Sequence, residues 1–431
     1  MVGARPPDSA RARGARPLWL LVHRYGGLFM ALFLVVIGLT GSIIVFNPEL
    51  YAWFDPPPVV APRPLPMLDD DTLRERALAL VPDGDITALT LRLKPNEPFT
   101  AYVTPRSGSA PGTVADTTTL ILMLDPYTGA ELRRERYSDA IWPITRKNIM
   151  PLVNRLHYEL AIPGTFGSYL FGVVALLWTI DCFVGAYLTF PIRARHRAQG
   201  DGHPMGFGRK SWWQRWKPAW LVKWRASAYR INFDLHRAGG LWVWLMLLVL
   251  AWTGVGFNLN EQVYVPAMRT VVGTHDAFSD LPPLKTPRAE PALSWRQAHG
   301  ISQEIMTQQA AMLGFHVQHE GALQYIPEKG VFLYSVRSDR DLGPEDAATY
   351  VLVDGGDGAF KGLSLPTGQN VGATVNSWLF ALHMAQVWGL PFRLFVSAMG
   401  LVVAMLSITG VYIWLQKKRA GQWSRRRTTS P

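Results

Sequence analysis

The chain has 431 residues, of which 48% are hydrophobic and 17% charged, and its formal net charge is +11. The single cysteine, Cys182, excludes an intrachain disulfide, a cysteine-ligated iron–sulfur cluster and a covalently attached c-type haem. Lysine and arginine are concentrated beside long apolar segments, so the positive charge indicates membrane topology, and we expect no nucleic-acid partner.

Four segments are apolar enough over about 20 residues to cross a lipid bilayer as helices. We expect these spans within residues 18–46, 151–191, 236–259 and 377–416, of which the second and fourth include a lead-in. Basic residues cluster in three other segments, residues 1–17, 192–235 and 417–431. The positive-inside rule then places both termini in the cytoplasm. The first span is longer than a signal-peptide core and lacks a cleavage site, which predicts a retained anchor.

Two polar stretches, residues 47–150 and 260–376, repeat one order of predicted elements. In the first stretch, a helix at residues 72–78 precedes strands near residues 86–93, 99–103 and 120–124. In the second stretch, a helix at residues 295–309 precedes strands near residues 315–317, 331–336 and 351–353. We therefore expect two α+β domains on the periplasmic side of the membrane.

The loop between the second and third spans combines cations with tryptophans, namely Trp212, Trp213, Trp216, Trp220 and Trp224. Tryptophan beside lysine and arginine favours the headgroup layer of a bilayer. The same mixture can stack on nucleic acid. The neighbouring spans favour lipid, so we expect an interfacial segment.

An internal repeat relates the first span to the third. The segment His23-Arg24-Tyr25-Gly26-Gly27 returns 213 positions later, from 23 to 236, as His236-Arg237-Ala238-Gly239-Gly240. Two more apolar runs follow the dipeptides Leu156-His157 and Leu382-His383. A repeat of this kind predicts a helical bundle with two-fold internal symmetry, in which each half brings two histidines to the membrane.

The chain resembles the PepSY-associated transmembrane family. The residues that carry the resemblance are those two histidine segments, Leu39-Thr40-Gly41, Trp252-Thr253-Gly254, Leu156-His157-Tyr158, Leu382-His383-Met384 and Gly410-Val411-Tyr412-Ile413-Trp414. The turn Asp125-Pro126-Tyr127-Thr128-Gly129 is similar to the end of a PepSY domain, whereas the second stretch departs from it with Asp354-Gly355-Gly356-Asp357-Gly358. The resemblance implies a bacterial inner-membrane protein. Four-span members are implicated in iron uptake, and some are dihaem reductases of ferric siderophores.

Four histidines are predicted haem ligands. His23 and His236 lie near the inner ends of their spans, and His157 and His383 precede spans near the outer surface. An ionisable side chain inside a membrane is costly and usually functional, and facing imidazoles commonly hold a haem iron without a covalent link. We expect two haem b groups, an inner one on His23 and His236 and an outer one on His157 and His383. The alternative is that these histidines form hydrogen bonds between helices.

Residues near these histidines extend the two predicted sites. Glycine lets a flat macrocycle approach a helix backbone or lets two helices pack closely, and this applies to Gly26, Gly27, Gly239 and Gly240. Arginine pairs with haem propionates, which are the predicted partners of Arg24, Arg237 and Arg155. Asp181 lies inside the second span, where it orients a ligand imidazole, carries protons or contacts another helix.

Ferric-siderophore reduction on the periplasmic side is the predicted activity. The chain has no dinucleotide-binding fingerprint, so electrons would come from a cytoplasmic reductant or from quinol. The siderophore would approach the outer haem beside Tyr158, Trp378, Trp388 and Arg393. The alternatives are a haem subunit that relays electrons between quinol and a periplasmic protein, and a non-catalytic regulator.

The remaining histidines are not predicted to bind a metal. If residues 316–319 form a strand, His316 and His319 point to opposite faces and cannot chelate one ion. We expect surface positions for the other four, His196, His203, His275 and His299.

Overall fold

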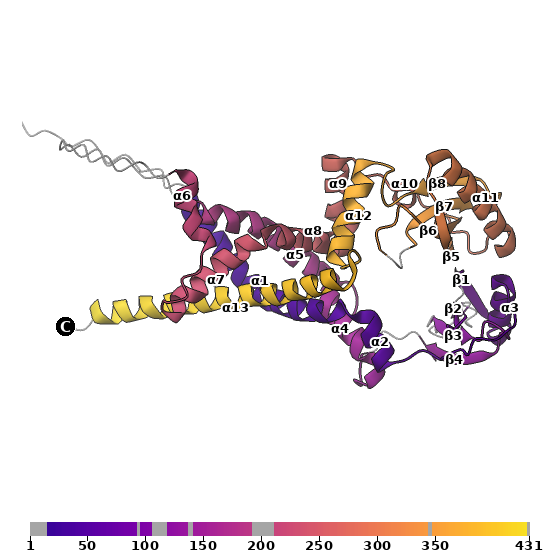
Figure 1. Ribbon diagram of the computed structural model, residues 1–431, viewed down its shortest axis with the longest axis horizontal. Helices are drawn as coiled ribbons and strands as arrows, with labels where there is room; N and C mark the ends of the chain where they lie inside the picture. Colours follow the sequence, from indigo (N-terminus) through magenta and orange to yellow (C-terminus); the bar gives the residue numbers. More distant parts are fainter. Residues whose placement is uncertain are drawn as a thin grey trace, which may run out of the picture. The chain divides into compact units, whose positions relative to one another are not determined.

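The computed structural model describes residues 15–92, 95–105, 119–136, 141–191, 211–343 and 347–428 (Figure 1). Parts of the three predicted basic segments, namely residues 1–14, 192–210 and 429–431, lie outside the described residues, as do His196 and His203. The chain divides into a helical unit and a sheet unit. The helical unit comprises Met1–Val45, Leu152–Val263 and Leu390–Pro431, and the sheet unit comprises Phe46–Pro151 and Tyr264–Gly389.

Three helices of the helical unit are long and apolar enough to cross a membrane: α1 (Arg16–Ile44), α5 (Phe166–Thr189) and α13 (Gly389–Thr428). A fourth span is formed only if α7 (Ala228–Trp242) and α8 (Trp244–Asn258) count together. These helices fit a membrane protein, as predicted. The unit also contains most of α4 (Ile149–Glu159), α6 (Trp212–Trp216) and the 3₁₀ turn Lys217–Trp220.

The third predicted span is a bent pair of helices. The axes of α7 and α8 differ in direction by 73° across the break at Val243, whose backbone is not helical. The indole nitrogens on either side donate to different segments: Trp242 to the carbonyl of Trp220 at 3.1 Å, and Trp244 to that of Cys182 at 2.8 Å. Gly239-Gly240 precedes the break by three residues, and pairs of small residues are common at helix kinks.

Small residues bring the spans close together. In Figure 1, α1, α5, α8 and α13 run alongside one another, and α5 packs against both α1 and α8. A Cβ atom on Gly38 of α1 would lie 2.5 Å from the carbonyl oxygen of Gly400 in α13. One turn further, Ser42 donates to the carbonyl of Ser397 at 2.8 Å. Close approach of this kind is typical of helices that pack within a membrane.

The sheet unit contains eight antiparallel strands in the order β4-β3-β2-β1-β5-β6-β7-β8. Their bounds are β1 Gly84–Thr90, β2 Phe99–Pro105, β3 Leu120–Leu124, β4 Glu131–Arg136, β5 Val317–Ile326, β6 Val331–Ser338, β7 Thr349–Asp354 and β8 Phe360–Ser364. The helices of this unit are α2 Asn47–Phe54, α3 Asp70–Leu80, α9 Val265–Val272, α10 Ala277–Asp280, α11 Trp295–Leu313 and α12 Val371–His383. Short helical turns lie at Arg146–Asn148 and Asn260–Tyr264, the second at the border with the helical unit.

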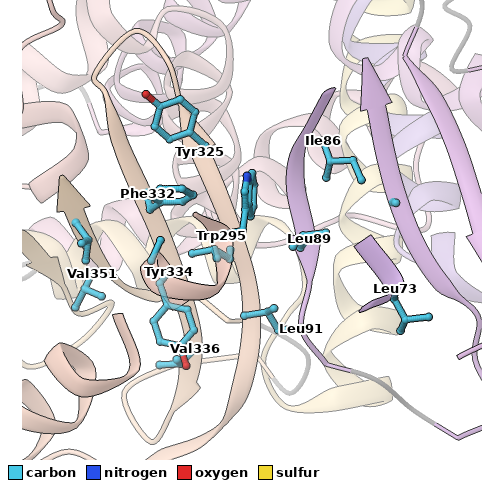
Figure 2. Close-up of a cluster of buried hydrophobic side chains, with 14 of the residues drawn as sticks. Leu73, Ile86, Leu89, Leu91, Trp295, Tyr325, Phe332, Tyr334, Val336 and Val351 are labelled. Atoms are coloured by element: carbon cyan, nitrogen blue, oxygen red, sulfur yellow. The ribbon is translucent and has the colours of Figure 1, made fainter. Parts of the chain in front are cut away.

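The two polar stretches form one sheet, whereas the sequence suggested two separate domains. Each stretch contributes one main helix followed by four strands, but β1 and β5 pair directly through Ala88, Leu89 and Thr90. Figure 2 shows Leu89 of β1 on the strand beside the second stretch, with Trp295 of α11 over the junction. Trp295 packs edge-on against Phe332, and both belong to a buried cluster that also includes Leu73 of α3. Burial of apolar side chains from both stretches in one core holds the halves together.

The turns after β3 and β7 have the same hydrogen bonds despite different sequences. Asp125 accepts from the backbone amide of Tyr127 at 2.8 Å, and Asp354 accepts from that of Gly356 at 2.8 Å. Each turn ends in a left-handed glycine, Gly129 with φ of 70° and Gly358 with φ of 77°. The left-handed backbone conformation therefore explains why both turns end in glycine.

Candidate functional site

A cavity of about 330 Å³ lies within the helical unit, between α1, α5, α7, α8 and α13. Apolar side chains such as Leu34, Trp178 and Val403 form most of its lining. The polar lining residues include His23 and His236, the two predicted ligands of the inner haem. The cavity therefore brings together residues that are far apart in the sequence.

His23 is held by a carboxylate and a glycine of α5. Its Nδ1 lies 2.9 and 3.0 Å from the two carboxylate oxygens of Asp181. A Cβ on Gly185, one turn after Asp181, would lie 3.5 Å from the imidazole ring. Positions four residues apart share one helix face, so α5 places a hydrogen-bond acceptor and a residue without a side chain against the same imidazole ring. We call such a glycine a notch glycine.

His236 is held in the same manner by α13, but without a carboxylate. Its Nδ1 lies 2.9 Å from the backbone carbonyl oxygen of Leu406 and 3.2 Å from Oγ1 of Thr409. The Thr409 hydroxyl donates to the carbonyl of Met405 at 2.8 Å, which leaves its oxygen free to accept. A Cβ on Gly410, four residues after Leu406, would lie 3.2 Å from the ring.

The two imidazoles face each other at a distance that suits ligation of one metal ion. Their ring centres are 6.0 Å apart and their planes differ by 59°. Two imidazoles whose nitrogens each lie about 2.0–2.1 Å from one metal ion would have ring centres no more than roughly 6 Å apart. Because Nδ1 of each ring is held by its partner, Nε2 is the nitrogen left for coordination. Among the described residues, no group of three or more His, Cys, Asp or Glu side chains is placed to hold a metal ion.

The imidazole of His157, in α4, packs against α1 near the C-terminal end of that helix. Its Nδ1 lies 3.1 Å from Oγ1 of Thr40, whose hydroxyl donates to the carbonyl of Val36, and a Cβ on Gly41 would lie 3.0 Å from the ring. Thr40 follows His23 by 17 residues in α1, about 25 Å of helix. His23 and the residues that hold His157 thus lie toward opposite ends of α1. His383 ends α12 in the sheet unit, and its pairing with His157 stays a prediction.

Residues 20–417 match the family described as PepSY-associated TM region. The chain belongs to this family. The resemblance inferred from the sequence is therefore confirmed at the level of the family. A comparison with curated proteins gave no match.

The four predicted glycines of this PepSY-associated TM protein have different surroundings. Gly27 and Gly240 line the cavity, and a Cβ on either would meet no atom within 4 Å. Gly26 has similar open space but does not line the cavity, and Gly239 packs against Met405 of α13. The glycines that contact the imidazoles are others, namely Gly41, Gly185 and Gly410.

The predicted arginines also differ from one another. Arg24 lines the cavity and has no ion pair among the described residues. Arg237 lines it as well, but donates to Asp234 at 2.8 Å and to the carbonyl of Pro218 at 2.8 Å. Arg155 pairs with Glu159 on α4. The sequence did not single out two further residues near this site. Asp234 is fully buried and pairs with Arg230 and Arg237, and its spacing to these arginines could have revealed it. Lys417 also lines the cavity.

The four residues that we predicted beside an approaching siderophore are divided between the helical unit and the sheet unit. In the helical unit, Tyr158 is exposed, and Arg393 donates to the carbonyl of Val45 at 2.7 Å, which ties α13 to the end of α1. In the sheet unit, the rings of Trp378 and Trp388 lie 5.9 Å apart. Arg393 therefore has a structural role of its own.

A second polar cluster lies in the sheet unit of this PepSY-associated TM protein. His299 of α11 is half-buried and its Nε2 lies 2.8 Å from Glu320 of β5, which corrects the expected surface position. Glu320 also accepts from Tyr334 at 2.6 Å and from Gln303 at 2.8 Å. Although burial acts to raise it, these hydrogen bonds lower the pKa of Glu320 to about 2. The bond to Glu320 raises the pKa of His299. Burial raises the pKa of the nearby Asp70 carboxyl, at the start of α3, to about 6.

Proposed function

We propose that the protein is a dihaem b-type electron-transfer protein of the bacterial inner membrane, and that it reduces ferric siderophores on the periplasmic side. In this proposal the four spans form a bundle with two-fold internal symmetry. Both termini are cytoplasmic and the sheet unit is periplasmic. The family, the apolar helices and the segregation of cations in the sequence support this arrangement.

The geometry of His23 and His236 carries the proposal. Their rings are 6.0 Å apart at a cavity with an apolar lining, and the Nδ1 atom of each is held by a neighbouring helix. A hydrogen bond from one nitrogen of each ring is enough to join two helices, so each ring keeps a second nitrogen for another role. Among the described residues, neither Nε2 atom has a hydrogen-bond partner, which leaves both available as ligands.

The contacts of the two inner ligands support two equivalent halves of the bundle. In both α5 and α13 an acceptor precedes the notch glycine by four residues, as Asp181 precedes Gly185 and Leu406 precedes Gly410. The seat of His157 on Thr40 and Gly41 supplies one ligand for a second, outer haem. His383 is its proposed partner, by analogy with the inner pair.

The reaction proposed at the outer end is a one-electron reduction of chelated iron. When bound, the haems would supply one-electron carriers, and the electrons would come from a cytoplasmic reductant or from quinol. Siderophore oxygens are hard ligands that prefer the ferric ion, so conversion to the ferrous ion weakens the chelate and releases the iron. The chain's own part is to orient the imidazoles and to exclude water from the cavity.

Visible absorption of the purified protein provides the first test. We expect the Soret and α-band positions of six-coordinate b-type haem, with two haems per chain. The dithionite-reduced protein, freed of excess reductant, is then mixed with ferric siderophores and a ferrous-iron trap. Reoxidation with trapped ferrous iron supports the reductase. Oxidation by quinone and by no ferric chelate would indicate the electron relay, and a protein without haem would indicate the regulator.

A further inference from the structure

Three cations line the haem cavity that we propose: Arg24 of α1, Arg237 of α7 and Lys417 of α13. Arg237 is paired with the buried carboxylate of Asp234, which Arg230 shares. Among the described residues, the side chains of Arg24 and Lys417 have no ion pair or hydrogen bond. Among the described residues that line the cavity, Asp181 is the single carboxylate, and it already accepts a hydrogen bond from His23. The cavity therefore carries positive charge that the described part of the chain does not neutralise.

Lys417 belongs to the cavity face of its helix. The α13 residues that line the cavity recur every three to four positions, through Val403, Ser407, Gly410 and Trp414 to Lys417. Lys417 follows Gly410, which contacts the ring of His236, by seven residues, about 10 Å of helix. Its neighbour Lys418 does not line the cavity and lies over the ring of Trp414 at 5.1 Å. Two adjacent lysines that would both count as topology signals thus have different surroundings.

A ligand that suits this cavity has an apolar body and an anionic end. Apolar residues such as Leu20, Leu28 and Leu247 would contact the body. Guanidinium and ammonium groups form strong, charge-assisted hydrogen bonds with carboxylates. Haem b has this chemistry, since its two propionates project from one edge of a flat apolar ring.

We propose that Arg24 and Lys417 bind the propionates of the inner haem and thereby fix the edge that faces this end of the cavity. The inference rests on the proposed function and adds Lys417 to the site. Arg237 plays a smaller part, because Asp234 holds it. An acidic phospholipid shares the same chemistry, with acyl chains in the cavity and a phosphate on the cations, and the experiment separates the two ligands.

The test measures the rate of haem loss rather than activity. Full-length protein in nanodiscs of zwitterionic lipid is loaded with haem b or with its dimethyl ester, and haem transfer to excess apomyoglobin is followed. Lys417→Ala and Arg24→Ala should each release haem roughly threefold to tenfold faster than the parent protein, the effect of one partly exposed charge-assisted contact. Lys417→Arg should retain the parent rate, and the matched control Lys418→Ala should not change it. The parent protein should release the dimethyl ester faster than haem, and Lys417→Ala should not accelerate loss of the ester further.

The outcomes distinguish this inference from the function on which it rests. A protein that binds no haem at the inner site would overturn both. Six-coordinate haem whose release is insensitive to Lys417→Ala and to esterification would overturn the inference alone. A release rate that depends on added phosphatidylglycerol or cardiolipin, but not on esterification, would assign the cations to lipid and also overturn it.

Discussion

His23 donates its Nδ1 proton to the carboxylate of Asp181, with 2.9 and 3.0 Å to the two oxygens. The equivalent acceptor for His236 is the neutral carbonyl of Leu406 at 2.9 Å. The two proposed ligands of one haem thus have different partners. A carboxylate makes an imidazole a stronger donor than a carbonyl does, so Asp181 should stabilise the ferric state of the inner haem.

Asp181→Asn should therefore retain haem and raise the midpoint potential of the inner haem. We expect an upward shift of roughly 50–100 mV, since a tenfold change in a one-electron equilibrium corresponds to about 59 mV. A spectroscopic redox titration measures it. Ser407→Ala is the control, because Ser407 lines the cavity while its hydroxyl donates to the carbonyl of Val403. An unchanged potential would assign Asp181 to helix packing alone.

Replacing either ligand of a pair should remove the same haem. His23→Ala and His236→Ala should each lower the haem content from two to one per chain, and His157→Ala and His383→Ala should remove the other haem. Five-coordinate haem is held less firmly, which explains the shared loss. Pyridine haemochrome assays give the content. His275→Ala, at an exposed histidine of the sheet unit, should keep both haems. Full haem content in all four ligand variants would refute the assignment.

A side chain at Gly41 should displace His157. The Cβ of any substituent would lie 3.0 Å from that imidazole, so Gly41→Leu forces the ring out of its seat. The haem content should fall toward one, with the inner haem unaffected. Gly26→Leu is the matched control on the same helix, because a Cβ there meets no atom within 4 Å. Equal haem loss in both variants would point to general misfolding.

Asp70→Asn should stabilise the sheet unit at neutral pH. Burial raises the pKa of this carboxyl to about 6, above the ordinary aspartate value of 3.8. The native state therefore binds this proton more tightly than the unfolded state does. The ionised Asp70 carboxylate does not destabilise the native state below pH 3.8, destabilises it increasingly between pH 3.8 and 6, and does so fully above pH 6. The full two-unit shift corresponds to about 3 kcal/mol, but partial exposure reduces the expected gain to about 1 kcal/mol.

Hydrogen exchange of β1 and β5 in the intact protein measures this change. Slower exchange of Asp70→Asn at pH 7.5, with little difference at pH 4, is the expected result. Asp71→Asn serves as the comparison, because Asp71 pairs with Arg296 of α11 at 3.1 Å and its loss should speed exchange. Identical exchange of Asp70→Asn and the parent at both values would contradict the prediction.

Exposed positions of the sheet unit should be labelled from the periplasm. Cys182 is buried, so cysteines introduced as Val59→Cys and Met312→Cys are the reactive thiols. A membrane-impermeant maleimide should modify both in intact cells with a permeable outer membrane, whereas Lys418→Cys should react only after lysis. Protection of either sheet-unit position would reverse the proposed topology.

Much of the inner site could be predicted because histidines at the same place in two repeated segments indicate one shared position. The partners of those histidines could not, since helical spacing shows which residues share a face but not which helix that face contacts. Asp181 was a candidate for several roles, and only the contact with His23 selects among its partners. The notch glycines, Gly185 and Gly410, look like ordinary packing residues until the rings are placed against them.

The fold shows a similar division. The strands β1, β2, β3, β6 and β7 were predicted, whereas β5 was expected near residues 315–317 and instead runs from Val317 to Ile326. Both edge strands, β4 and β8, were missed, and β4 carries the charged sequence Glu131-Leu-Arg-Arg-Glu-Arg136 that is typical of an edge. The break at Val243 follows Gly239-Gly240 by three residues, and Trp242 and Trp244 beside it donate to distant segments that the local sequence does not reveal. The pairing of β1 with β5 also joins residues far apart in the chain, which no local pattern indicates.

That pairing sets an order for biosynthesis. β1 is translated more than 200 residues before β5, and two apolar spans are translated between them. Until β5 emerges, the hydrogen-bonding edge of β1 is open, and open edges template aggregation. The first four strands therefore have to wait as an incomplete half-sheet, and a ribosome that stalls after the third span would leave that half without the partner that covers it.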